Sequence, residues 1–229
     1  MDHPAITRDR VAVITGAASG IGLAAAQALA ARGMRVCLAD RDEDKLEQGL
    51  ATIEGTAISH TTDVADLDSV LALRQRVLDE FGEVALLMNN AGTGAATGSW
   101  TELSNWQRII GVNFWGVVHG LQTFTQQMID QGTPCAIINT GSKQGITNPP
   151  GSPAYNASKA GVKSVTESLA HELRNTEGCQ VTAHLLVPGF TYTGMISRFV
   201  PEQPPAAWRP EQVVERLLEN IGAGDFYVI

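Results

Sequence analysis

Short runs of apolar residues alternate along the chain with longer segments whose apolar residues recur at helical spacing. A near-continuous apolar run of about four to seven residues is typical of a strand buried on both faces of a parallel sheet. The sequence therefore predicts strands at 11–14, 35–39, 56–60, 84–88, 136–139, 181–187 and 225–229. The segments between them predict helices at 21–32, 44–53, 67–81, 102–129 and 154–174, with a last helix opened by Pro210 and closed by Gly222 and Gly224.

Strand–helix alternation along the whole chain predicts an α/β fold, a doubly wound seven-stranded parallel sheet with helices on both faces. No linker or repeat interrupts the pattern, so we expect one domain over residues 1–229. The proline-rich stretch 201–210 lies between the sixth strand and the last helix, and we expect an ordered loop or flap there. The sequence ends inside the last expected strand, so we expect either a truncated chain or an unusually short tail.

Composition excludes several classes of protein. Hydrophobic residues make up 44% of the 229 residues, which excludes a disordered or fibrous chain. The formal net charge of −8 argues against a nucleic-acid partner and against an anionic membrane surface. No apolar run approaches the roughly 20 residues that span a bilayer, and no basic stretch precedes an apolar core at the N-terminus. We therefore expect a soluble cytoplasmic protein.

Cysteine and histidine are dispersed, which argues against a metal site. We expect each cysteine to be a buried thiol in a strand-like apolar run, in a reducing compartment: Cys37, Cys135 and Cys179. We assign no metal to the histidines that lack Cys or acidic neighbours in sequence, namely His60, His119 and His184. His3 is expected in the N-terminal tail, and His171 at the surface or in an interface.

A glycine-rich loop follows the first expected strand directly and opens a helix. Its glycines, Gly16, Gly20 and Gly22, permit a tight turn, and the helix start presents N–H groups and a dipole to a pyrophosphate. The alternative is a plain strand-to-helix turn. Asp40 closes the second strand, where its carboxylate would accept hydrogen bonds from ribose hydroxyls and repel a 2′-phosphate. The alternative for Asp40 is a loop residue or helix cap, for which Asp42 and Asp44 compete.

A second group of residues suggests proton transfer. Tyr155 and Lys159 stand four residues apart, so a helix places them on one face, and Ser142 lies thirteen residues before the tyrosine. A neighbouring ammonium lowers a phenol's pKa, and the serine hydroxyl can orient a substrate oxygen. Taken singly, the pair fits a solvated helix face, Ser142 fits an ordinary loop, and Asn113 fits a helix-interior amide satisfied by a local backbone group.

The motifs together resemble those of short-chain dehydrogenases/reductases, in the same order. They are Thr15-Gly16-x-x-x-Gly20-x-Gly22, Asn89-Asn90-Ala91-Gly92, Asn113, Ser142, Tyr155-x-x-x-Lys159 and Pro188-Gly189. The resemblance runs from residue 11 to 187 and beyond. It implies a single Rossmann-like domain with strand order 3-2-1-4-5-6-7.

The resemblance also implies how a dinucleotide is bound. Backbone atoms of Ile21 would meet the phosphates or the nicotinamide side, and Thr193 the diphosphate or the carboxamide. The adenine pocket would be lined by Asp63 and Val64, the adenosine ribose by Asn90, Ala91 and Gly92, and the carboxamide by Pro188, Gly189 and Thr191. Relatives that prefer NADP carry a basic residue at the position of Ser19 or replace the acid at Asp40, so NAD is expected. Arg41 is the one feature that softens this preference.

By the same resemblance, Tyr155 is the general base in oxidation and the general acid in reduction. Lys159 lowers the pKa of Tyr155 and binds the nicotinamide ribose, Ser142 holds the substrate oxygen, and Asn113 binds a water that links Lys159 to solvent. The helices carrying Asn113 and Tyr155 pair across subunits in such enzymes, so a homodimer or homotetramer is expected. Trp106 and Trp115 are then packing or subunit-contact residues.

Substrate walls are expected from the loops 93–100, 143–153 and 192–208, with Trp100 bordering the first. We expect Lys143 and Gln144 to contact an acidic or hydroxylated substrate. The alternative is that Lys143 points to solvent. An apolar lid from Met195, Ile196, Phe199 and Val200 suits a mid-sized alcohol or ketone. The sequence thus predicts an NAD-dependent oxidoreductase interconverting a secondary alcohol and a ketone. The alternatives are an NADPH-dependent ketoreductase, or a non-catalytic NAD-binding sensor or scaffold.

Overall fold

The computed structural model describes residues 2–194 and 200–229 of the chain. Its centre is a seven-stranded sheet in the order β3-β2-β1-β4-β5-β6-β7, and every neighbouring pair is parallel. This confirms the predicted fold class and strand order. The strands are β1 Val11–Thr15, β2 Arg35–Asp40, β3 Ala57–Thr61, β4 Leu86–Asn89, β5 Cys135–Thr140, β6 Val181–Leu186 and β7 Tyr227–Val228.

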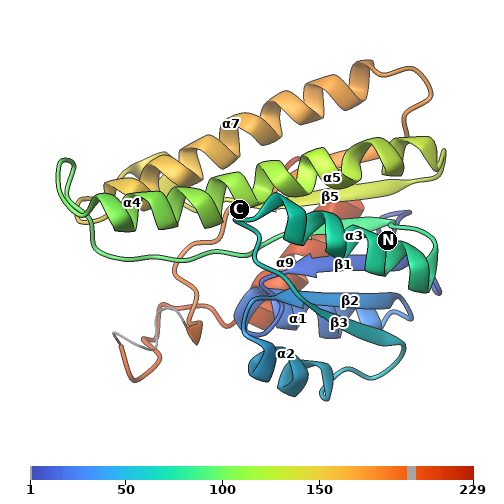
Figure 1. Ribbon diagram of the computed structural model, residues 1–229, viewed down its shortest axis with the longest axis horizontal. Helices are drawn as coiled ribbons and strands as arrows, with labels where there is room; N and C mark the ends of the chain where they lie inside the picture. The colour runs from blue at the N-terminus through green and yellow to red at the C-terminus, as the bar shows by residue number, and fades with distance from the viewer. Residues whose placement is uncertain (1, 195–199) are drawn as a thin grey trace.

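Helices cover both faces of this sheet. They are α1 Gly20–Ala30, α2 Glu43–Leu50, α3 Leu67–Phe81, α4 Leu103–Ile110, the π-helical η1 Gly111–Trp115, α5 Gly116–Asp130, α6 Gln144–Thr147, α7 Pro153–Asn175 and α9 Pro210–Ala223. One core cluster joins the sheet to α1, α2 and α9, and a second joins its other face to α3, α5 and α7. In Figure 1, α4, η1 and α5 form one long rod beside α7.

The alternation of side chains along β1 explains why its sequence is apolar throughout. Ala12 and Ile14 belong to the cluster on one face, whereas Val11 and Val13 belong to the cluster on the other. All four are fully buried. A strand covered on both faces has no solvated side, and each buried Val or Ile side chain contributes about 1.5–3 kcal/mol to stability.

Several boundaries differ from the sequence prediction. The helix expected at 102–129 is interrupted by the π-helical turn η1, since apolar spacing alone does not distinguish a π-helical turn from an α-helical one. The short helix α6 was not predicted, and the fourth strand begins at Leu86 rather than at residue 84. Gly222 lies inside α9, and only Gly224, with φ of 85°, ends that helix. Cys179 lies partly buried in the loop before β6, not in a strand.

His3 is not part of a free tail, contrary to the sequence prediction. Its side chain is 6% exposed, its Nδ1 accepts a hydrogen bond from the Ala5 N–H, and its Nε2 lies 3.1 Å from Oγ1 of Thr182. Its ring also packs edge-on against that of His184, 5.6 Å away. Burial lowers the pKa of His3 to about 4, so the ring is neutral near pH 7. The contact with Thr182 spans 179 residues, which no local pattern reveals.

Within the described part of the chain, no helix combines the length and the apolar character needed to cross a bilayer.

Candidate active site

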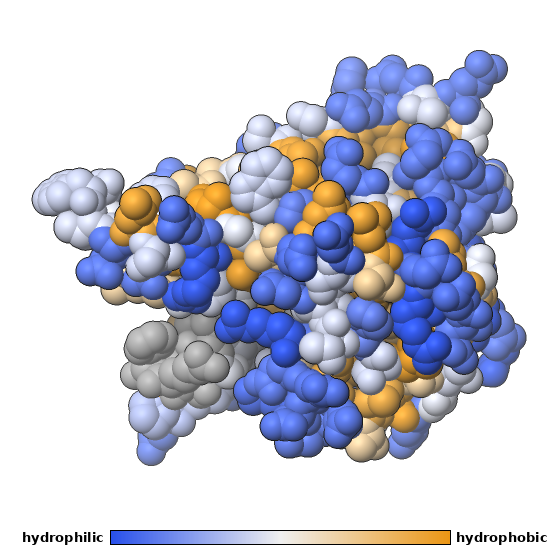
Figure 2. All heavy atoms as spheres, viewed as in Figure 1, coloured by the Kyte–Doolittle hydropathy of each residue, from blue (hydrophilic) through white to orange (hydrophobic). Residues whose placement is uncertain are grey.

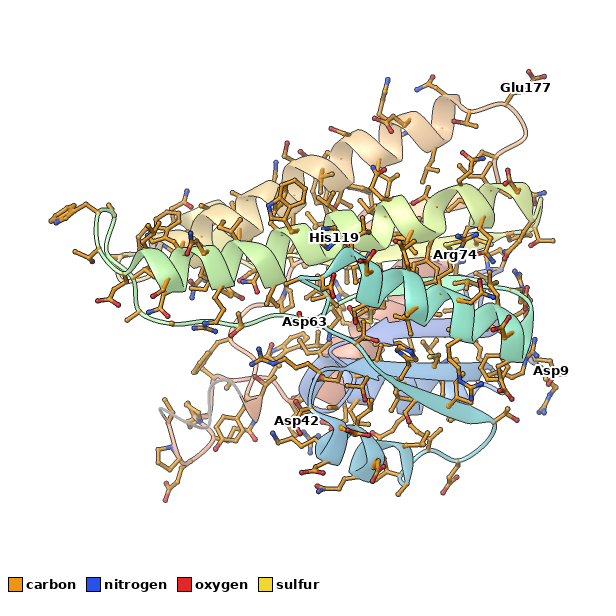
Figure 3. The ribbon with its side chains drawn as sticks, viewed as in Figure 1. Asp9, Asp42, Asp63, Arg74, His119 and Glu177 are labelled. Atoms are coloured by element: carbon orange, nitrogen blue, oxygen red, sulfur yellow. The ribbon has the colours of Figure 1, made fainter. Side chains whose placement is uncertain are left out.

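The predicted site residues gather at one edge of the sheet, because all strands are parallel and their carboxyl ends meet there. In Figure 3, Asp42 and Asp63, which follow β2 and β3, mark this edge. Asp9 and Glu177, which precede β1 and β6, lie at the far end of the molecule. The glycine-rich turn, the loops after β4 and β5, and the start of α7 all open onto the carboxyl edge.

The turn after β1 requires glycine for two separate reasons. Gly16 and Gly20 have φ values of 67° and 58°, in the left-handed region that side chains disfavour. A Cβ on Gly16 would lie 2.7 Å from Cα of Ala91, and one on Gly22 would collide with the carbonyl oxygen of Gly16. The three glycines therefore bring the turn against the loop after β4.

The start of α1 is suited to an anion. Ser19 is the N-cap residue, but its side chain makes no capping hydrogen bond, and the first turn holds no acidic residue. The N–H groups of that turn and the positive end of the helix dipole therefore face the carboxyl edge without a carboxylate from the helix itself. The Thr193 methyl group lies 3.2 Å from where a Cβ on Gly20 would stand, so Thr193 lies over the turn. These features fit a dinucleotide's diphosphate.

Asp40 ends β2 beside this turn and is partly buried. One carboxylate oxygen accepts the Ala18 N–H at 3.2 Å, and the other accepts the Asp42 N–H at 3.1 Å. Asp42, not Asp40, caps α2 by accepting the Lys45 N–H at 3.2 Å. Asp40 is therefore oriented by the glycine-rich turn and is not a helix cap, while Arg41 next to it is exposed.

The loop after β3 rests on the long helical rod. Asp63 is exposed and accepts the Ala65 N–H, whereas Val64 is 6% exposed. The carbonyl of Val64 accepts a hydrogen bond from Nδ1 of His119 at 2.9 Å, and a Cβ on Gly116 would stand 2.7 Å from the Val64 side chain. Val64, one of the two predicted adenine-pocket residues, thus lies against α5.

Asn90 ties three strand ends together. Its Nδ2 donates to the Thr15 carbonyl at 3.0 Å, and its Oδ1 accepts from the Thr140 hydroxyl at 3.3 Å. Ala91 donates its N–H to Oγ1 of Thr15 at 3.2 Å. Gly92, which follows, is exposed at the carboxyl edge. The Asn90–Gly92 segment therefore holds the ends of β1, β4 and β5 in register.

Lys159 is the most deeply buried charged group of the site, with 3% of its surface exposed. Its Nζ donates to the Thr140 carbonyl at 2.7 Å and lies 5.9 Å from the centre of the Tyr155 ring. Burial lowers the pKa of Lys159 to about 8. Tyr155 and Lys159 share one helix face, as predicted.

The pKa of Tyr155 moves in the opposite direction from the one we expected. Burial raises it, and this influence is larger than that of the hydrogen bond with Ser142, which lowers it. The Lys159 ammonium points at the Thr140 carbonyl rather than at the phenol oxygen. A four-residue spacing places two side chains on one face, but it does not decide which acceptor the ammonium chooses.

Ser142 follows β5 and is partly buried. Its hydroxyl hydrogen-bonds Tyr155, and its Oγ accepts the Gln144 N–H at 3.2 Å. Lys143 donates its N–H to the Pro188 carbonyl at 3.1 Å, which joins this loop to the one after β6. The Lys143 side chain is exposed, in agreement with the alternative that it points to solvent.

Asn113 is fully buried, and its partners are not helical backbone groups. Its Oδ1 accepts the Thr93 N–H at 2.8 Å, and its Nδ2 donates to the Thr93 carbonyl at 3.0 Å and to Oγ of Ser158 at 3.1 Å. The alternative of a locally satisfied helix amide is therefore wrong. A Cβ on Gly92 would stand 3.6 Å from Oδ1 of Asn113 and 3.9 Å from Nζ of Lys159, so both atoms border one small space.

The loop after β6 is described in part. Gly189 is exposed, Pro188 is partly buried, and Thr191 is buried and pairs with Trp208. Ile21, on α1, is also partly buried. Three residues expected in an apolar lid, Met195, Ile196 and Phe199, lie outside the described residues. Val200 is partly buried.

Three contacts of the site were not predicted: the Thr140 carbonyl, Ser158 and Arg108. Ser158 stands three residues after Tyr155 and so on the same helix side, which was a usable signal. Its hydroxyl donates to the Tyr155 carbonyl at 2.7 Å. Arg108 has no acidic residue three or four positions away in the sequence, which is a weaker signal that it has another partner. Among the described residues, no three His, Cys, Asp or Glu side chains gather as a metal site.

The chain belongs to the short-chain dehydrogenase family. The family's short chain dehydrogenase model matches residues 10–204, which is most of the chain. The chain is therefore an oxidoreductase of this family with an NAD(P)-binding Rossmann fold.

Two curated relatives illustrate the range of the family. A cis-4-hydroxycyclohexanecarboxylate dehydrogenase of Sinomonas cyclohexanicum is 36% identical over 213 residues, covering 91% of this chain and 84% of that protein. A Mycobacterium tuberculosis protein named SadH is 41% identical over 169 residues, covering 72% of this chain. The match spans 60% of SadH, less than two thirds of its length.

Solved structures of similar proteins hold either coenzyme. A short chain dehydrogenase/reductase from Burkholderia phymatum in complex with NAD has a TM-score of 0.89 and 37% identity, covering 96% of this chain and 88% of that one. A metagenomic short-chain oxidoreductase in complex with NADP has a TM-score of 0.81 and 30% identity, covering 98% and 97%.

Proposed function

We propose that this protein is an NAD-dependent oxidoreductase that interconverts a secondary alcohol and a ketone by hydride transfer. The observation that carries the proposal is the cluster of Ser142, Tyr155 and buried Lys159 beside the glycine-rich turn, at one edge of the sheet. Bound NAD supplies the hydride acceptor in oxidation, and its reduced form supplies the donor in reduction. The protein's own residues then have to hold the substrate oxygen and move one proton.

Tyr155 is the group that moves this proton. In oxidation its phenolate takes the proton of the alcohol, and in reduction its phenol returns one to the ketone oxygen. Ser142 donates a hydrogen bond to the same substrate oxygen and stabilises charge that develops there. Positioned acid–base groups of this kind contribute about 10²- to 10⁴-fold to a rate.

Lys159 and Asn113 support that transfer. Below a pH of about 8, Lys159 carries a charge that favours the Tyr155 phenolate once the ammonium reorients from the Thr140 carbonyl. We propose that Lys159 also binds the nicotinamide ribose, and that Asn113 holds a water leading from Lys159 towards solvent. The short distances from the Gly92 position to both Nζ of Lys159 and Oδ1 of Asn113 support this arrangement.

The coenzyme preference rests on Asp40 and Ser19. The Asp40 carboxylate is held at the end of β2 by the Ala18 N–H, where a negative charge repels a 2′-phosphate. Ser19 supplies no positive charge at the turn. Exposed Arg41 is the residue that would favour NADP if the preference were reversed. The other coenzyme contacts are proposed for Gly16, Gly20, Ile21, Gly22, Asp63, Val64, Asn90, Ala91, Gly92, Pro188, Gly189, Thr191 and Thr193.

A second copy of the chain is the proposed partner. A shallow hollow of about 340 Å³ on the helical rod is lined by Trp106, Gln107, Ile110, Gly111 and Trp115. Trp115 is 49% exposed, although it is large and apolar. In Figure 2, hydrophobic residues are interspersed with polar ones over the helices α4, α5 and α7. Association through this face would give a homodimer or homotetramer.

Nicotinamide absorbance tests the proposal, with NAD⁺ and NADP⁺ measured separately against a panel of secondary alcohols. We expect turnover with NAD⁺ in the wild type and a loss of at least about 100-fold in Tyr155→Phe. Faster turnover with NADP⁺ would contradict the assignment of Asp40 and favour an NADPH-dependent ketoreductase. Tight NADH binding without turnover of any alcohol or ketone would favour a non-catalytic sensor.

A further inference from the structure

We propose that Arg108 is a positioning residue for the proton transfer, because it clamps Thr93, and the Thr93 backbone in turn fixes Asn113. The inference rests on the proposed function and extends it to a residue on α4 whose hydrogen bonds go to Thr93 and Asn105.

The contacts form a continuous path. Nη1 of Arg108 donates to Oγ1 of Thr93 at 2.6 Å. Both main-chain polar groups of Thr93 bond to the Asn113 amide, its N–H to Oδ1 and its carbonyl to Nδ2. Nδ2 of Asn113 also donates to Oγ of Ser158, which donates to the Tyr155 carbonyl. The path therefore runs from α4 to the loop after β4, then to η1 and finally to α7.

Arg108 suits this clamp because its guanidinium is a planar fork with several donors. While Nη1 holds Thr93, Nη2 lies 3.4 Å from Oδ1 of Asn105, which is also on α4. The side chain is partly buried, and none of the ion pairs among residues 2–194 and 200–229 includes it. Removing a cation from water without a carboxylate partner costs free energy. The placement of the Arg108 guanidinium against the Thr93 hydroxyl therefore requires an explanation.

The hydrogen bond from Arg108 holds Thr93 at a place where a small displacement of Thr93 would disrupt the hydrogen bonds of Asn113. Thr93 directly follows Gly92, and Gly92 borders the space shared by Oδ1 of Asn113 and Nζ of Lys159. If Thr93 moves, the Asn113 amide loses two of its three partners together. Among the described residues, the titratable groups placed at this space are Lys159 and, beside it, Tyr155. Burial and Ser142 set the pKa of Tyr155, and burial alone sets that of Lys159, without a carboxylate.

A purely structural role for Arg108 predicts a different outcome from a positioning role. A structural role predicts lower stability with an unchanged pH dependence of turnover. A positioning role predicts that the pH dependence itself changes, because the Asn113 amide no longer supports proton movement beside Lys159. The test therefore compares the pH profile of kcat with the melting temperature in each variant.

The decisive variants are Arg108→Met and Thr93→Val. The first removes the clamp and its charge, whereas the second keeps the charge and removes only the acceptor hydroxyl. In both, we expect kcat for alcohol oxidation at pH 7 to fall about tenfold and the apparent pKa of the rising limb to increase by at least about 0.5 unit. The Kd for NADH is expected to stay within about twofold, and Thr93→Ser should restore the wild-type profile.

Arg74 provides the matched control. It is a partly buried arginine on α3 (Figure 3), and its Nε donates to Oε1 of Gln127 at 3.1 Å. Arg74→Met should lower the melting temperature without shifting the pH profile. A wild-type pH profile of kcat in Thr93→Val would overturn the proposal, because Arg108 would then not act through its hydrogen bond to Thr93. If Tyr155→Phe kept full turnover, the proposed function would fail instead, and the two failures are therefore distinguishable.

Discussion

Replacing Lys159 with methionine removes a buried charge while keeping a long side chain in its place. Lys159 is 3% exposed, and its pKa falls from 10.5 to about 8 because of burial. The difference is about 2.5 pKa units, which at about 1.4 kcal/mol per unit corresponds to about 3 kcal/mol of charge-burial cost at pH 7. The lost hydrogen bond to the Thr140 carbonyl offsets about 1–3 kcal/mol of that cost. We therefore expect the free energy of unfolding of Lys159→Met at pH 7 to be about 1 kcal/mol higher than that of the wild type, although the variant loses turnover.

At high pH the stability difference between Lys159→Met and the wild type changes sign. Between about pH 8 and pH 10.5 the unfolded chain still binds the proton of Lys159, whereas the folded protein has released it. Wild-type stability should therefore rise with pH across this window, by about 3 kcal/mol from this residue. Lys159→Met lacks that rise, so its advantage at pH 7 becomes a deficit of about 2 kcal/mol near pH 10.

Urea unfolding at about pH 7 and about pH 10 measures both values, with Lys163→Met as the control. Lys163 lies on the same helix with 39% of its side chain exposed, and it pairs with Glu167 at 2.8 Å, so its removal should leave the stability difference between the two pH values nearly unchanged. The reasoning fails if Lys159→Met is destabilised equally at both pH values, because Lys159 would then carry no burial penalty.

Three further outcomes are expected. Gly120→Ala should destabilise the fold by about 1–3 kcal/mol in urea unfolding, because its Cβ would collide with the Asn89 side chain, whereas Gly111→Ala, whose Cβ would stand 3.7 Å from Cβ of Ala65, should be nearly neutral. His3 should contribute about 1–2 kcal/mol to the fall in wild-type stability between pH 6.5 and pH 4, since its pKa is depressed in the folded state and only the unfolded chain gains the proton; a fall in His3→Asn as large as that of the wild type would contradict this. Asp40→Ala should raise KM for NAD⁺ about tenfold and reduce discrimination against NADP⁺ in steady-state assays, and unchanged discrimination would contradict its role.

The sequence predicted the parts of the fold that depend on local pattern. The apolar strand of Val11–Ile14 and the glycines after it define β1 and the turn to α1, and the same strand–helix alternation predicts the parallel sheet. Asp40 was also located correctly at the end of β2, because strand ends follow from where an apolar run stops.

Properties that depend on distant contacts could not be predicted in the same way. The partners of Asn113 lie 20 and 45 residues away, and the Arg108–Thr93 contact joins residues 15 positions apart. The raised pKa of Tyr155 follows from burial by the assembled fold, which outweighs its hydrogen bond with Ser142. Spacing on a helix indicates neighbours but not the solvent exposure that sets their pKa values.

The central claim is that Tyr155 moves the proton in an NAD-dependent oxidation. The most direct measurement compares wild type and Tyr155→Phe for NADH affinity, by fluorescence titration, and for the rate of NADH formation with saturating NAD⁺ and an active alcohol. We predict a Kd within about twofold of wild type and a rate at least about 100-fold lower. A variant that retains its rate would contradict the assigned role of Tyr155, and so would one that loses NADH binding in proportion to its rate.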